Sequence, residues 1–357
     1  MPQPGRLLSK ILTLIDKRFL WFLLGTYAIA AFAPSFGMRL KDISFGRVGI
    51  LGQSTKVTLS MAMLGLLLFD AGLGVSLAKL KDLARRPWLL VLGVAANLTV
   101  PLAFILIVNA VMAFWHNTDE VQNILVGLAL VAAMPIAGSS TAWTQNANGD
   151  LPLSLGLVVA STLFSPLTTP LALHAVGLMA KGDYAEDLHD LANHGTGAFL
   201  AVAVILPSVL GIGVNRLVGD ARLTTIEPYL VLVNSAVLLL LSYTNASVAL
   251  PQAIRRPDPD FLVAILAITL GLCVVAFGSG YAIARAFQAD DAKRTSLMFG
   301  LGMNNNGTGL VLASMALAEH PQVMLPVIFY NLVQQIVAGG VDYVRDRAVA
   351  AKAHGAA

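Results

Sequence analysis

Two polar stretches inside apolar segments hold the residues that could do chemistry. One is "MPIAGSST" at residues 134–141, and the other is "GLGMNNNG" at residues 300–307. Proline lacks a backbone donor and glycine loosens a helix, so each stretch predicts a broken helix with freed backbone amides and carbonyls. Such groups are tolerated at membrane depth where they line a cavity, and a half-helix that starts near Ser139 would turn its positive end toward an anion. The pattern predicts binding of an ion or polar solute.

The composition places these stretches in a membrane. Of the 357 residues, 57% are hydrophobic and 12% are charged, with a mean hydropathy of +0.75. A soluble domain carries roughly 25% charged residues. We therefore expect an all-α polytopic membrane protein in contact with the lipid bilayer. Ten segments are long and apolar enough to be its spans, namely 19–36, 57–78, 87–114, 121–147, 151–178, 195–217, 227–249, 260–287, 294–317 and 321–343.

The charges of the connecting segments orient these ten spans. With the N-terminus in the cytoplasm, 16 of the 23 Lys and Arg residues fall on the cytoplasmic side, as the positive-inside rule requires. We expect both termini in the cytoplasm and a bacterial inner membrane as the location. This asymmetry accounts for the net charge of +3. No basic run is interleaved with aromatic residues, so we expect no nucleic-acid partner.

An acidic loop at 181–194 divides the spans into two sets of five. Because five is odd, the second set enters the membrane from the opposite side, which predicts two inverted repeats, residues 1–180 and 195–347. Within them, residues 66–77 align without gaps on residues 239–250. The two breaks then fall in corresponding spans, the fourth and the ninth. A single Gly or Asn would more often serve helix packing, but paired breaks indicate a transporter's binding site.

Three segments resemble the bile acid:sodium symporter (BASS) family. They are residues 135–170, the "GMNNNG" at 302–307 and the "FDAGLGVSLAKLKDLARRP" at 69–87. The resemblance implies a panel domain of spans 1, 2, 6 and 7, and a core domain of spans 3–5 and 8–10 in which the broken spans 4 and 9 cross. It also implies a secondary active transporter of an organic anion, bile-acid-like or a small carboxylate, working by cation-coupled symport and alternating access.

The resemblance further implies two groups of site residues. The substrate-binding group is Gly138, Ser139, Asn305, Asn306, Tyr330 and Asn331. The sodium ligands are Ser140, Thr141, Ser154, Asn97, Leu301, Met303 and Asn304. Where the family carries a glutamate, this chain has Gly300. Because neutral oxygens alone bind sodium more weakly, the identity of the coupling ion stays open.

Asp70 is the only carboxylate well inside a predicted span. Burying it costs about 2.5–3.5 kcal/mol, so it is either a proton or cation site that replaces the missing glutamate, or a structural hydrogen-bonding group. A proton-coupled or uncoupled carrier or channel of the same fold is the alternative function.

We expect no enzymatic activity and no organic cofactor, because neither an intramembrane His–Glu–His spacing nor a G-x-S-x-G motif occurs. The expected partners are a small organic anion and lipid. Monomer and homodimer both stay open.

Overall fold

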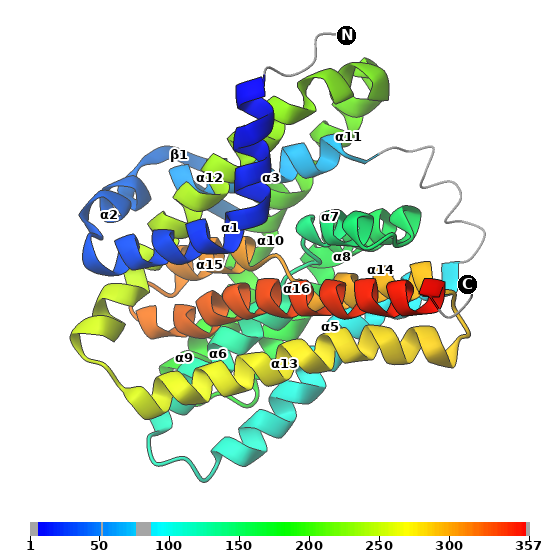
Figure 1. The fold of residues 1–357 in the computed structure, drawn as a ribbon. Helices are drawn as coiled ribbons and strands as arrows, with labels where there is room; N and C mark the ends of the chain where they lie inside the picture. Colours follow the sequence, from blue (N-terminus) through cyan, green and yellow to red (C-terminus); the bar gives the residue numbers. More distant parts are fainter. Residues whose placement is uncertain (1–5, 51–52, 76–86, 355–357) are drawn as a thin grey trace.

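The computed structural model describes residues 6–50, 53–75 and 87–354, and most of them lie in α-helices (Figure 1). Six described helices are long and apolar enough to cross a membrane, or seven if one bent pair counts as a single span. The protein is therefore a helical polytopic membrane protein. The predicted number of ten spans is not reached by this criterion, because three of the predicted spans consist of shorter helices. The six helices are Pro87–Met112, Leu151–Gly177, Thr196–Val218, Arg222–Arg255, Pro259–Ala286 and Pro321–Arg345.

The N-terminal segment bends twice before it reaches the first loop. Helix α1 (Arg6–Phe32) has a non-helical residue at Arg18. Helix α2 (Ser35–Asp42) then turns by 91° from the second part of α1, and this is the bent pair. The predicted first span, 19–36, therefore covers the second part of α1 and the corner after it.

A β-hairpin follows where the sequence predicted a loop at 37–56. Strands β1 (Ser44–Ile50) and β2 (Gln53–Thr58) pair antiparallel, so the prediction of a loop is wrong here, and the hairpin is a local exception to the otherwise helical fold. The β-branched residues Thr55, Val57 and Thr58 favour an extended chain in β2. Helix α3 (Leu59–Leu73) begins directly after it, and the Thr58 side chain accepts a hydrogen bond from the Met61 amide at 3.2 Å. The predicted second span thus starts in a strand and continues as a helix of 15 residues.

The acidic segment between the two halves is helical, so the prediction of a loop at 181–194 is also wrong. It contains α9 (Asp183–Asp190) and the π-helical turn η1 (Leu191–Gly195). Asp183 and Glu186 lie in the first turn of α9, where negative charge is favourable. The preceding helices are α5 (Pro87–Met112), α6 (Thr118–Ala133), α7 (Ser139–Asn146) and α8 (Leu151–Gly177).

The second half begins with α10 and a second π-helical turn, η2, before the long helices. Its elements are α10 (Thr196–Leu200), η2 (Ala201–Ile205), α11 (Leu206–Val218), α12 (Asp220–Arg255), α13 (Pro259–Ala286), α14 (Asp291–Gly302), α15 (Asn306–Ala316), the 3-10 turn η3 (Pro321–Val323) and α16 (Met324–His354).

The helices pack most extensively in two groups. Helix α1 packs on α12, and α3 packs on α11 and α12, whereas α13 packs on α14 and α16, and α8 packs on α5 and α6. In Figure 1, α13 and α16 run next to each other across the lower half of the molecule. Glycines bring α3 and α11 together. A Cβ at Gly72 would lie 2.2 Å from the Ser208 carbonyl oxygen, and one at Gly211 would lie 2.1 Å from that of Phe69.

Candidate functional site

Both helix breaks occur at the predicted residues. The first break, residues 134–138, separates α6 from α7, and the second, residues 303–305, separates α14 from α15. Met134 and Met303 each end their helix in extended backbone, with ψ values of 145° and 104°. Asn305 begins α15 by accepting a hydrogen bond from the Thr308 amide at 3.2 Å. Each break therefore leaves one helix C-terminus and one helix N-terminus inside the protein.

The two breaks pair with each other through their backbones. The Ala137 amide donates to the Met303 carbonyl at 2.9 Å, and the Asn305 amide donates to the Pro135 carbonyl at 2.9 Å. These bonds make a short antiparallel bridge that is centred on residues 136 and 304. Segments that are remote in sequence thus satisfy part of each other's free backbone, which holds the two breaks against each other. We call this junction of the two breaks the crossing.

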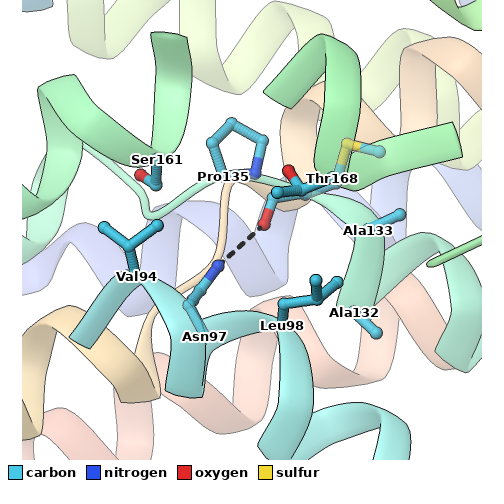
Figure 2. Close-up of a pocket in the computed structure, with 9 residues that line it drawn as sticks. Val94, Asn97, Leu98, Ala132, Ala133, Pro135, Ser161 and Thr168 are labelled. Carbon is cyan, nitrogen blue, oxygen red and sulfur yellow. Dashed lines mark hydrogen bonds between the residues drawn. The ribbon is translucent and has the colours of Figure 1, made fainter. Parts of the chain in front are cut away.

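Side chains from two other helices, α5 and α8, and from the second break donate to the C-terminal carbonyls of α6. The donors are Asn304 Nδ2 at 2.9 Å, Thr169 Oγ1 at 2.6 Å and Asn97 Nδ2 at 3.4 Å. Figure 2 shows Asn97 extending from α5 toward the break, beside a pocket that Ser161 and Thr168 of α8 help to line. The carbonyls that accept are those of Val131, Ala133 and Met134. The pocket has room for about one water molecule.

Gln334 of α16 organises the second break. Its Oε1 accepts from the Asn304 amide at 3.2 Å and from Asn306 Nδ2 at 3.0 Å. Its Nε2 donates to Asn331 Oδ1 at 3.3 Å, and Asn331 Nδ2 donates to the Tyr27 hydroxyl at 2.9 Å. A continuous amide chain therefore links the crossing to α16 and α1. The sequence offered a signal for Gln334, a polar stripe in an apolar helix, but not its partners.

Comparison with known proteins identifies the family. The model of the sodium bile acid symporter family matches residues 61–254. The chain belongs to this family. It is 26% identical to the uncharacterized protein YbaS of Bacillus subtilis (strain 168) over 224 residues, which are 62% of this chain and 69% of the relative. It is 24% identical to the uncharacterized sodium-dependent transporter YocS of the same organism over 256 residues, 70% of this chain and 72% of the relative.

A mammalian relative matches a shorter region. The chain is 29% identical to the sodium-dependent organic anion transporter of Bos taurus over 156 residues, 44% of this chain and 39% of the relative. Family membership, together with the membrane-length helices, makes this protein a membrane transporter. The family match includes the first break and ends before the second. The description of the second break therefore depends only on its geometry in this structure.

The predicted substrate residues of this symporter-family protein fall into two groups by exposure. Ser139 is exposed, and Gly138, Asn305 and Asn331 are half-buried. Asn306 and Tyr330 are buried, and the Tyr330 hydroxyl donates to the Gly302 carbonyl at 3.2 Å. In this structure the first group has exposed surface, whereas the second group holds the end of α14 and the start of α15 in place.

Six of the seven predicted sodium ligands are buried, and Thr141 is half-buried. Ser154 Oγ donates to Thr141 Oγ1 at 3.2 Å. Among these predicted ligands, three buried side-chain oxygens have no hydrogen-bond partner within the described residues, which is uncommon for buried polar atoms and suits a cation ligand. They are Ser140 Oγ, Asn97 Oδ1 and Asn304 Oδ1.

Leu157 packs against Gly300, the position where the resemblance to the family would place a glutamate. A Cβ added at Gly300 would lie 3.0 Å from Leu157 Cδ1 of α8. Leu157 is fully buried, and it follows Ser154 by one helical turn. A side chain at residue 300 would therefore need Leu157 to move.

Two further polar side chains lie outside the crossing, Asp70 on α3 and Asn245 on α12. Asp70 of α3 is half-buried and accepts a hydrogen bond from Asn234 Nδ2. Its neighbour Ala71 borders the first break, since a Cβ at Gly138 would lie 3.4 Å from the Ala71 methyl. Asn245 is buried, and neither of its amide atoms has a partner within the described residues. Sequence reasoning missed Asn245 as a site candidate, although "SYTNAS" is a polar run in an apolar helix.

Proposed function

We propose that this protein is a secondary active transporter that moves an organic anion together with a cation by alternating access. The observation that carries the proposal is the crossing, where two half-helix N-termini and two half-helix C-termini meet. The N-termini of α7 and α15 favour a carboxylate, and the C-termini of α6 and α14 favour a cation. A relative named as a sodium-dependent organic anion transporter supports the same pairing.

We assign the anion to the accessible side of the crossing. Gly138 and Ser139 would offer the first turn of α7, and Asn305 would offer the start of α15. Asn306 and Tyr330 lie buried behind them, bonded to Gln334 and to the Gly302 carbonyl, and the half-buried Asn331 borders this layer through its hydrogen bond to Gln334. We propose that the carboxylate contacts the first group and that the second group shapes the cavity. The apolar remainder of the substrate, from a small carboxylate to a bile-acid-like body, would extend toward α12.

Sodium is proposed as the co-transported cation. One group of ligands is Ser140, Thr141 and Ser154, and the other is Asn97, Asn304 and the backbone around Leu301 and Met303. The orphaned oxygens of Ser140, Asn97 and Asn304 support this assignment. None of these ligands carries a full charge, so we expect weak sodium binding that depends on the negative ends of α6 and α14.

Movement of one helix group against the other would provide alternating access. We propose that α1, α3, α11 and α12 form the panel, and that the helices around the crossing form the core, which agrees with how these helices pack. We also propose ten spans arranged as two inverted repeats, with each broken pair of helices counted as one span. Both termini would lie on the cytoplasmic side of a bacterial inner membrane, and the protein would act as a monomer or homodimer.

Proton coupling through Asp70 is the second candidate. Asp70 is half-buried on α3, and the Glu227 carboxylate adds a second negative charge in its surroundings. Asp70 lies near the crossing, because its neighbour Ala71 borders the first break. Protonation of Asp70 could then be linked to movement of α3 past the crossing.

Uptake into proteoliposomes tests these assignments. We expect a sodium gradient to drive accumulation of cholate or lactate, and Ser140→Ala to raise the sodium concentration needed for half-maximal uptake. Ser139→Ala combined with Asn305→Ala should abolish uptake, and retained uptake would contradict the assigned substrate site. Accumulation that follows a proton gradient and is lost in Asp70→Asn would favour the second candidate. A lack of counterflow would indicate a channel.

A further inference from the structure

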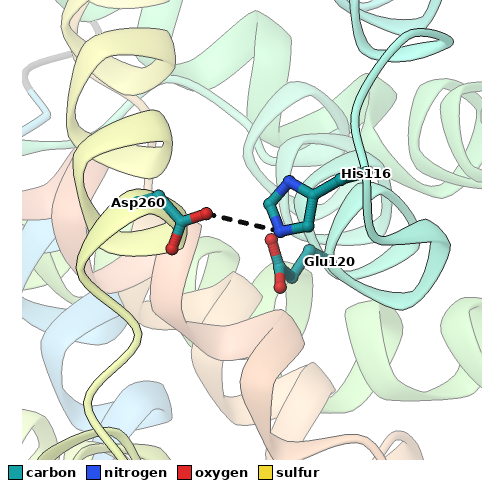
Figure 3. Close-up of side chains that lie close together, drawn as sticks. All are labelled: His116, Glu120 and Asp260. Atoms are coloured by element: carbon teal, nitrogen blue, oxygen red, sulfur yellow. Dashed lines mark ion pairs between the residues drawn. The ribbon is translucent and has the colours of Figure 1, made fainter.

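A histidine and two carboxylates meet at the end of the bundle remote from the crossing. His116 lies between α5 and α6, Glu120 in the first turn of α6, and Asp260 in the first turn of α13 (Figure 3). His116 Nε2 is 3.4 Å from Asp260 Oδ2, and one ligand atom of each residue lies within 4.8 Å of the other two. In the described part of the chain, no other three His, Cys, Asp or Glu side chains meet this criterion.

Glu120 is held in position as metal ligands usually are. Its side chain is buried, with 4% of the residue exposed. Its two carboxylate oxygens accept hydrogen bonds from Trp115 Nε1 at 2.7 Å and from Asn117 Nδ2 at 2.5 Å. Each oxygen retains a second lone pair. Such outer hydrogen bonds orient carboxylate ligands in metal sites.

The charge balance also favours a cation here. Within the described residues, no Lys or Arg forms an ion pair with Glu120 or Asp260. Asp258, which begins α13, adds a third carboxylate close to Asp260. A buried carboxylate without a paired charge is costly. A single histidine, even when protonated, offsets only one of these negative charges.

We propose that His116, Glu120 and Asp260 form a binding site for a divalent transition-metal ion of the zinc class. An imidazole nitrogen with two carboxylate oxygens selects such ions over magnesium or calcium, which prefer oxygen ligands only. Bond lengths of about 2.0–2.2 Å place neighbouring ligands of a tetrahedral site roughly 3.4 Å apart. His116 and Asp260 already meet that separation, and both are exposed side chains that can shift toward Glu120.

The ion would join the connection between α5 and α6 to the start of α13. Glu120 is the third residue of α6, which ends at Ala133, so the site lies about 21 Å from the first break at 1.5 Å per residue. The metal site is thus separate from the proposed transport site, and it stands whether or not the transport assignment is correct.

The test is zinc binding by the purified full-length protein in detergent, after chelator treatment. Calorimetry with ZnCl2 should give one saturable site per chain, zinc should raise the melting temperature, and MgCl2 at the same concentration should not. His116→Ala and Asp260→Asn should each weaken zinc binding by at least about tenfold, the lower end of the loss caused by removing outer-shell partners. Visible absorption of Co²⁺ bound at the same site should disappear in both variants.

A second histidine pair in the chain provides the control. His174 and His189 face each other with their Nδ1 atoms 3.0 Å apart, and His189→Ala should leave the zinc affinity unchanged. Zinc binding that survives His116→Ala, or that is lost in His189→Ala, would overturn the proposal. Equal stabilisation by magnesium would also overturn it, because it would remove the role of the imidazole.

Discussion

Replacing Gln334 by leucine should destabilise the crossing. The change removes the acceptor shared by the Asn304 amide and Asn306 Nδ2, and the donor to Asn331. Leucine cannot replace these hydrogen bonds, and Gln334 is only 2% exposed, so water cannot either. Two orphaned donors at about 1–3 kcal/mol each give about 2–6 kcal/mol. Three bonds at the membrane-protein average of about 0.6 kcal/mol give about 2 kcal/mol. The two estimates meet near 2 kcal/mol, which is the expected loss in the free energy of unfolding.

Unfolding in SDS, followed by circular dichroism, measures this loss. Gln335→Leu is the matched control, because Gln335 is half-buried and accepts one hydrogen bond, from Trp143 Nε1 at 3.2 Å. We expect it to cost about 0.6 kcal/mol. Initial uptake should fall several-fold in the Gln334 variant and little in the control. Equal destabilisation of the two variants, with transport retained in both, would refute the assignment of Gln334 as the organiser of the second break.

Two further substitutions examine packing and coupling. Gly302→Ala should destabilise the protein by about 1–3 kcal/mol through overpacking, because the added Cβ would lie 2.1 Å from Phe277 Cδ2. Gly278→Ala is the control and should be neutral in the same SDS titration, because a Cβ at Gly278 would meet nothing within 4 Å. Equal losses in the two variants would contradict the packing argument. Asp70→Asn should leave sodium-driven uptake intact if Asp70 only hydrogen-bonds Asn234, and should abolish proton-driven uptake if Asp70 carries the proton. Uptake at two external pH values, with and without sodium, separates these outcomes.

The positions of the helix breaks could be predicted because their causes are local. Pro135 and Gly138 interrupt one apolar run, and Gly300 and Gly302 loosen the other. The partners of the freed groups could not be predicted. Gln334 is 30 residues from Asn304, and its neighbour in sequence is an equally good acceptor. Only the packing of α16 against the second break decides which of the two amides points inward.

The hairpin and the acidic helix escaped prediction for a different reason. Strand β1 contains Gly46, with φ of 110°, which in a sequence resembles a turn, and its pairing with β2 is a tertiary event. Helix α9 is polar enough to suggest a loop, but Leu188 is buried where α9 packs on α8. In both cases the contact that stabilises the element lies outside it, so local composition indicates the wrong structure.

Gly300 and Leu157 connect this packing argument to ion coupling. A glutamate at residue 300 would supply a full negative charge, but here the leucine side chain lies against the glycine. Under the proposed function, the negative potential at the cation site would then come from helix ends. Helix α14 ends at Gly302 and α6 ends at Ala133, and each C-terminus carries roughly half an elementary charge. Two such ends together approach the charge of one carboxylate. The N-termini of α7 and α15 supply the opposite sign at the same junction. Under the proposed function, the crossing itself would therefore hold a cation and an anion together, which makes binding of each depend on the other.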